Sequence, residues 1–163
     1  MLKSITIVYV LFILGANPLS AQSKALAVQD SIWQRAYNSR IKKTKLFGNY
    51  IPLNIGDAHR SLAKLISPEA RQKMMNMTEN QVEHKLFFSL GRWISVNWGF
   101  EGGSRLSHSL KQFGLSHPED MAVFVMLTYH RKLNHLPLNP KSLIEKLVNA
   151  RKAEWMKRRK VIK

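Results

Sequence analysis

The stretch Trp93–Leu106 (WISVNWGFEGGSRL) holds the densest combination of residues in the sequence that could bind a ligand or react. The glycine pair 102–103 should end one helix and Ser104 should start the next. The free N–H groups of a helix start, beside the guanidinium of Arg105, could bind an anion. In the alternative interpretation, the glycines form a turn, Ser104 caps the helix and Arg105 pairs with an acid such as Asp120. We favour this structural interpretation because it explains every unusual residue in the stretch.

The candidate polar site is therefore a junction between helices, and its residues share polar or aromatic side chains next to expected helix ends. They are Trp98, Glu101, Ser104, Arg105, His117 and Asp120. Glu101 has no second carboxylate near it in the sequence, so paired acid–base work as in glycoside hydrolysis is not indicated. The sequence Ser107-His108-Ser109 is not a nucleophile–base pair, because neighbouring positions on a helix point in different directions. We predict no catalytic residue.

The histidines do not indicate a metal site. No two of them are three or four residues apart, and the chain has no cysteine, so a zinc site would have to be assembled from distant segments. The sequence predicts no metal and no other cofactor.

Positive charge is concentrated at the two ends of the chain. Residues 22–45 carry six basic side chains and one acidic, residues 46–140 carry ten and seven, and residues 141–163 carry nine and two. Near the C-terminus, Trp155 precedes the run Lys157, Arg158, Arg159 and Lys160, which could bind anionic lipid or nucleic acid. The alternative is a solvated helix end, where basic residues are favourable.

The elements that must position these residues are predicted to be helices. Helix starts are indicated by Ser67-Pro68, by Asn139-Pro140, and by the capping boxes Thr78–Gln81 and Ser116–Glu119. Asn54 or Asp57 should start another, and Gly48 and Gly114 should follow helix ends. Apolar spacing then predicts helices at about 24–46, 54–66, 67–76, 78–98, 104–113, 117–135 and 140–160.

These helices predict an all-α fold, a compact bundle of about five to six helices with basic helical N- and C-terminal arms. The run Met121–Tyr129 is apolar on every side, so we expect it to be the central helix. Gly91 lies within an apolar stripe and should permit a close contact between helices.

The N-terminus has the pattern of a secretory signal peptide. Lys3 precedes an apolar run at residues 5–16, with cleavage expected after Ala21. The run is shorter than the about 20 residues that span a bilayer. The predicted organisation is a signal peptide at 1–21, a basic helical arm at 22–48, a helical domain at 49–150 and a basic helix end at 151–163. The mature chain, without a transmembrane span, should be periplasmic or extracellular.

Residues 51–147 resemble a family of small bacterial helical domains of unknown function, of Bacteroidetes type. The pattern of that family is GLGxWIRNxWGLWxGSRL followed by HPDDMS. The resemblance is carried by Leu90, Gly91, Trp93, Ile94, Trp98, Gly99, Gly103, Ser104, Arg105, Leu106, Gly114, His117, Pro118, Asp120 and Met121. The chain departs from the pattern at Phe87, Ser95, Val96 and Glu101, where the family has a histidine, an arginine-asparagine pair and a tryptophan. The resemblance thus implies a divergent member that has lost these polar groups.

The expected function is that of an exported, non-catalytic binding or interaction protein whose basic arms meet an acidic protein, lipid or envelope polymer. Export makes nucleic acid an unlikely partner. One alternative is an enzyme acting on the cell envelope, with Glu101, Arg105, His117 and Asp120 converging at the helix junctions. Another is an immunity-like or inhibitor protein. The sequence does not predict an oligomeric state.

Overall fold

The computed structural model describes residues 18–161, with helix α1 at Pro18–Arg40. Contacts divide the chain into two units, and the boundary between them falls within α1, between Arg35 and Ala36. The predicted signal peptide lies, as far as residue 17, outside the described residues. No helix in residues 18–161 is both long enough and apolar enough to cross a membrane.

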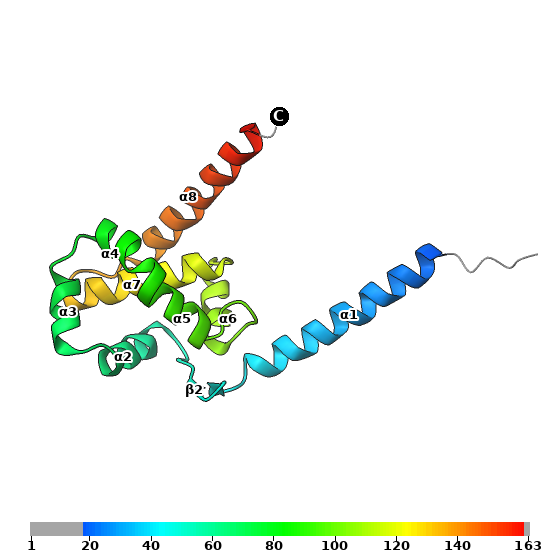
Figure 1. The fold of residues 1–163 in the computed structure, drawn as a ribbon, viewed down its shortest axis with the longest axis horizontal. Helices are drawn as coiled ribbons and strands as arrows, with labels where there is room; N and C mark the ends of the chain where they lie inside the picture. The colour runs from blue at the N-terminus through cyan, green and yellow to red at the C-terminus, as the bar shows by residue number, and fades with distance from the viewer. Residues whose placement is uncertain (1–17, 162–163) are drawn as a thin grey trace, which may run out of the picture. The chain divides into compact units, whose positions relative to one another are not determined.

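The second unit begins at Ala36 and carries the hydrophobic core. Its described elements are mostly helical, as predicted, and Figure 1 shows their arrangement. They are β1 (Lys45–Leu46), β2 (Asn49–Tyr50), α2 (Ile55–Leu65), α3 (Pro68–Met75), α4 (Glu79–Lys85), the π-helical segment η1 (Phe87–Gly91), α5 (Arg92–Asn97), α6 (Arg105–Gln112), α7 (Pro118–Leu133) and α8 (Pro140–Val161).

Helix α7 is the centre of this unit. It contacts α2, α3, α4, η1, α5, α6 and α8, and each residue from Met121 to His130 is buried. In Figure 1 α7 is the yellow helix that the others surround. Full burial of an aliphatic or aromatic side chain stabilises the fold by about 1.5–3 kcal/mol. The prediction of a central helix at Met121–Tyr129 is therefore confirmed.

Local capping signals placed most helix starts correctly. Asn54, Ser67 and Thr78 each accept a hydrogen bond from a backbone N–H of the helix that follows, and Thr78 forms its predicted capping box with Gln81. Helix α8 begins at Pro140, directly after Asn139, and Gly114 has a φ of +102° after the end of α6.

The predicted capping box at Ser116–Glu119 was wrong. The N-cap of α7 is His117, with Pro118 in the first turn, and no side chain caps this end. A Ser116 cap would require a helical conformation at His117. A residue that precedes proline avoids the helical region because of a clash with the proline ring. The φ and ψ of His117 are −97° and 132°, which is extended backbone.

The basic N-terminal arm ends earlier than predicted. Helix α1 stops at Arg40 instead of continuing to residue 46, and β1 pairs with β2 in an antiparallel hairpin. Phe47 and Gly48 form its turn with φ of +50° and +82°, as a tight hairpin turn requires. Gly48 therefore does not follow a helix, and the mostly helical fold includes a short strand pair that the sequence did not predict.

The helix predicted at 78–98 is interrupted by η1. The N–H of Gly91 donates to the carbonyl of Leu86 at 3.0 Å, a bond five residues back along the chain. A β-carbon on Gly91 would lie 3.1 Å from Met126 Cε of α7. Gly91 thus permits the close contact that its position in the apolar stripe predicted.

Candidate functional site

The first helix junction, at residues 98–105, is closed by the end of α1. A β-carbon on Gly102 would lie 2.7 Å from the guanidinium of Arg40, and one on Gly103 would lie 2.4 Å from the ring of Tyr37. Arg40 Nε also donates to the carbonyl of Gly103 at 3.0 Å, and Tyr37 Oη is hydrogen-bonded to His108 Nδ1 at 3.0 Å. The glycines therefore provide space for two side chains of the same chain.

Ser104 and Arg105 have structural partners in this junction. Ser104 caps the start of α6, as the structural interpretation predicted, and it does so in a capping box with Ser107. Arg105 Nε donates to the carbonyl of Ile51 at 2.7 Å, and the guanidinium lies 5.0 Å from the ring centre of Tyr50. The predicted pairing of Arg105 with Asp120 was wrong. Arg105 instead contacts Tyr50 and Ile51, which precede α2, and Asp120 pairs with Arg151.

Trp98 belongs to the core. Its side chain is 1% exposed and meets the ring of Trp93 edge to face, with 6.0 Å between the ring centres. It is positioned by the end of α5, where it is the C-cap residue. Its contribution is to packing.

The second junction, at residues 113–120, joins α6 to α7 and is tied to α8 by charge. Arg151 of α8 donates from Nε to Asp120 Oδ2 and from Nη2 to Asp120 Oδ1 at 2.7 Å, and Glu119 lies 3.4 Å from Nη2. Hydrogen bonding to Asp120 raises the pKa of the Arg151 guanidinium. This geometry fixes the beginning of α7 against the middle of α8.

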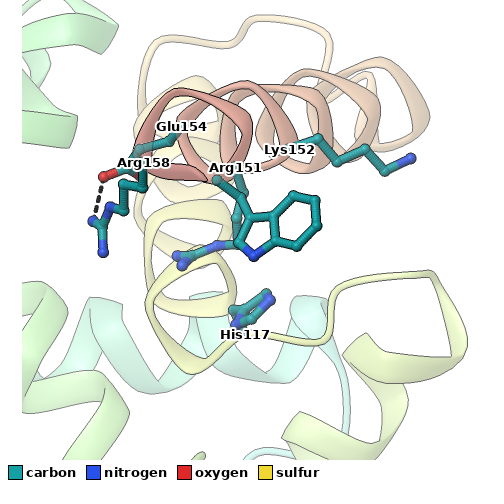
Figure 2. A pocket seen from close by; sticks show the side chains of 6 residues that line it. His117, Arg151, Lys152, Glu154 and Arg158 are labelled. Carbon is teal, nitrogen blue, oxygen red and sulfur yellow. Dashed lines mark hydrogen bonds and ion pairs between the residues drawn. The ribbon is translucent and has the colours of Figure 1, made fainter. Parts of the chain in front are cut away.

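A cavity of about 350 Å³ opens beside this ion pair. It is lined by His117, Arg151, Lys152, Glu154, Trp155 and Arg158. Figure 2 shows His117 in the turn before α7, pointing toward α8, with Arg158 and Glu154 paired at one end. This hydrogen bond from Arg158 lowers the pKa of Glu154. Trp155 is 55% exposed, so part of its side chain is available to a ligand or a surface.

The side of α8 that lines the cavity continues the side that packs on the core. Leu143 and Leu147 are buried against the bundle, and Arg151, Trp155 and Arg158 follow at helical spacing. The structure thus brings His117 of the predicted junction together with Arg158 of the predicted basic run. Arg151 was not among the predicted site residues, although its position one turn after Leu147 could have indicated it.

The second half of α8 carries further cations, of which Lys152 also lines this cavity. Lys152, Lys157 and Lys160 are exposed and take part in no ion pair among the described residues. Arg159 stacks its guanidinium over Trp155, 4.6 Å from the ring centre. The net charge of this helix end is strongly positive, because residues 151–160 hold six basic side chains and one acidic side chain, Glu154.

Glu101 lies in a third place. It lines a cavity of about 250 Å³ that Glu119, a carboxylate eighteen residues later in the sequence, also lines. Phe87, Ser95 and Val96 line the same cavity. All four positions where the chain departs from the resembled pattern therefore meet at one cavity, beside η1.

The structure thus does not unite the six predicted junction residues. Arg105 is held by the hairpin, Asp120 by Arg151, and Glu101 and His117 line different cavities. Among the described residues, no group of three or more histidine or acidic side chains could hold a metal ion.

Sequence reasoning also missed the buried polar pair of His59 and Thr128. His59 Nε2 lies 3.0 Å from Thr128 Oγ1, and both side chains are buried between α2 and α7. Burial, with a smaller contribution from Lys132, lowers the pKa of His59 to about 4. In the helix that starts after Asn54, His59 lies next to the apolar Ala58 and Leu62. This position could have predicted that His59 is buried.

Comparison with known proteins gives a family without an assigned activity. A family model described as a domain of unknown function, DUF6794, matches residues 51–133. No curated protein and no solved structure matches the chain. The matched segment begins after β2 and ends with α7, so it contains both helix junctions and excludes α8. The chain therefore belongs to the DUF6794 family of domains of unknown function.

Proposed function

We propose that this protein is an exported, non-catalytic binding protein, a divergent bacterial member of its family, whose C-terminal helix binds an anionic lipid surface of the cell envelope. The observation that carries the proposal is the excess of exposed cations at the end of α8, Lys152, Lys157, Arg159 and Lys160, of which Lys152 shares a cavity with Trp155 and Arg159 stacks on its ring. Each basic residue near an anionic membrane contributes about 1 kcal/mol of attraction.

A lipid surface suits this helix end better than a small soluble anion. Trp155 and Met156 are both about half exposed among the cations. Tryptophan prefers the interface between lipid and water, and basic side chains beside it reach the headgroups.

The absence of catalysis is supported by the separation of the polar groups. Arg105 and Asp120 are each occupied by a structural partner, and His117 lies at a different cavity from Glu101. An acid–base mechanism needs its groups within hydrogen-bond reach of one substrate position. The cavity that holds Glu101 and Glu119 has lost the polar groups of the resembled pattern at Phe87, Ser95 and Val96.

The test is a triple charge reversal on the full chain, Lys157→Glu, Arg159→Glu and Lys160→Glu. We expect at least about tenfold weaker binding to phosphatidylglycerol vesicles at about 50 mM salt. Unsubstituted protein should lose most of its binding at about 300 mM salt, because exposed charges are screened. Binding is measured by vesicle sedimentation, and circular dichroism checks that the helices remain.

The matched control reverses the same number of charges elsewhere, at Lys64, Lys73 and Lys85. These lysines are exposed in the last turns of α2, α3 and α4, so the change at a helix C-terminus is also matched. If both variants lost vesicle binding equally, the loss would be explained by the net charge of the protein, and the role of α8 would be rejected. Binding to an acidic polymer but not to phosphatidylglycerol would reject the lipid as partner.

A further inference from the structure

Another cavity lies away from the first helix junction and from the basic end of α8, and it reaches the second junction at Phe113. Its volume is about 640 Å³, within the about 300–1,000 Å³ range typical of small-molecule sites. It is formed where α2, α6, α7 and α8 meet, and it is lined by Asn54, Ile55, Ser109, Leu110, Phe113, Phe124, Pro140, Lys141, Ile144 and Glu145.

The walls of this cavity are apolar. Leu110 and Phe124 are almost fully buried and belong to the core, and Ile144 packs against it. Phe113 is the exception, because 67% of its side chain is exposed although it lines the cavity. A phenylalanine held at the mouth of an apolar cavity gains burial when a ligand covers it.

The few polar groups at the cavity limit the chemistry of that ligand. Asn54 is already used as the N-cap of α2, where its side chain accepts from the N–H of Asp57. Apart from Lys141 and Glu145, Ser109 is the other polar residue in the lining. The walls therefore offer little to a ligand with polar groups along its length, such as a sugar or a nucleotide. An unbranched hydrocarbon chain fits an apolar wall without leaving polar groups unpaired.

One end of the cavity favours a single negative charge. Lys141 lies in the first turn of α8 and forms no ion pair among the residues that the structure describes. Its ammonium and the positive end of the helix dipole act in the same direction. Glu145 lines the cavity one turn later and opposes this attraction, so it would repel a headgroup with two negative charges more strongly than one with a single charge.

We propose that this cavity binds a free fatty-acid-like amphiphile, with the hydrocarbon chain against Leu110, Phe113 and Phe124 and the carboxylate at Lys141. The site is separate from the lipid-surface role of α8, because the two share no lining residue. Its occupant is a single soluble molecule, not a bilayer.

Binding is tested on the full chain by calorimetry with dodecanoate, kept below the concentration at which it forms micelles. Dodecyltrimethylammonium has the same chain with a cationic head, and acetate has the head without the chain. We expect micromolar binding of dodecanoate, at least about tenfold weaker binding of the cationic amphiphile, and none of acetate. No binding of dodecanoate, or equal binding of both amphiphiles, would overturn the proposal.

Substitutions locate the site and separate it from general hydrophobic adsorption. Phe113→Ala should weaken dodecanoate binding about tenfold, whereas Phe88→Ala should leave it unchanged, because Phe88 is 80% exposed but lies at another cavity. Lys141→Glu should weaken binding, and Glu145→Gln should strengthen it. The charge control is Lys73→Glu on α3. Equal effects of Phe113→Ala and Phe88→Ala would overturn the assignment to this cavity.

Since Phe113 and Lys141 are exposed, these variants should fold. A filling variant, Ser109→Phe, provides a second and independent test from inside the cavity. It should abolish binding while retaining cooperative urea unfolding. Retained binding in this variant would reject the site even if the other variants behave as expected.

Discussion

The two helix junctions are made from similar residue types but differ in what covers them. At residues 98–105, Tyr37 and Arg40 occupy the space above the glycine pair, and the guanidinium of Arg105 is held by Ile51. At residues 113–120, His117 faces a cavity beside α8. A glycine turn followed by a helix start is thus not a binding site in itself. Its availability depends on side chains that arrive from distant parts of the sequence.

The largest difference in stability between the two junctions is expected when their glycines, Gly103 and Gly114, are substituted. Gly103 and Gly114 both have positive φ, +87° and +102°, but a β-carbon on Gly114 would meet only Ile144 at 3.9 Å. Gly103→Ala should lower the free energy of unfolding by about 3–4 kcal/mol, because left-handed strain is added to the displacement of Tyr37. Gly114→Ala should cost about 1–2 kcal/mol from strain alone. Urea unfolding measures both.

A second experiment separates the strain from the clash. In a Tyr37→Ala background, the loss caused by Gly103→Ala should fall toward that of Gly114→Ala. Equal losses for the two glycines in the unsubstituted protein would mean that Tyr37 does not close the first junction.

Buried and exposed histidines should also differ in how they affect the pH dependence of stability. The buried His59 has a pKa of about 4, whereas an unfolded histidine titrates near 6.5. The unfolded state therefore binds the proton first as the pH falls. Stability should be complete above pH 6.5 and decrease by about 2–3 kcal/mol as the pH falls to 4. Urea unfolding at several pH values measures this loss.

His59→Gln should remove most of this pH dependence while keeping a donor for Thr128. The hydroxyl of Thr128 donates to the carbonyl of Phe124, so it accepts from His59, which places the imidazole proton on Nε2. His117→Gln is the matched control, because His117 is exposed and should leave the pH dependence unchanged. An equal slope in the two variants would contradict the assignment to His59.

The sequence predicts a structural feature well when the residues that determine it are close together in the chain. The caps at Asn54, Ser67, Thr78 and Ser104 involve residues three positions apart, so their signals are local and were interpreted correctly. The central position of α7 followed from its uniform apolarity.

The partner of Arg105 could not be predicted in the same way. It depends on the turn at Phe47 and Gly48, which lacks the usual asparagine-glycine signal. The pairing of β1 with β2 at this turn places Tyr50 and Ile51 next to α6. The cavity at His117 depends on how α8 packs on α7, and helical periodicity gives the face of a helix but not its neighbour. Tyr37 and His108, 71 positions apart, meet for the same reason.

The smallest effect is expected at the ion pair that holds the second junction. Asp120→Asn removes the charge that neutralises Arg151 but keeps a similar shape, and the pair is only partly buried, with side-chain exposures of 14% and 32%. We expect a loss of about 1 kcal/mol in urea unfolding. Glu154→Gln, which releases Arg158 from a fully exposed pair, should not change stability measurably. Both substitutions add one positive charge beside Trp155, so both should strengthen binding to phosphatidylglycerol vesicles. If Asp120→Asn weakened binding while Glu154→Gln strengthened it, vesicle binding would depend on the position of α8 at the second junction more than on its charge.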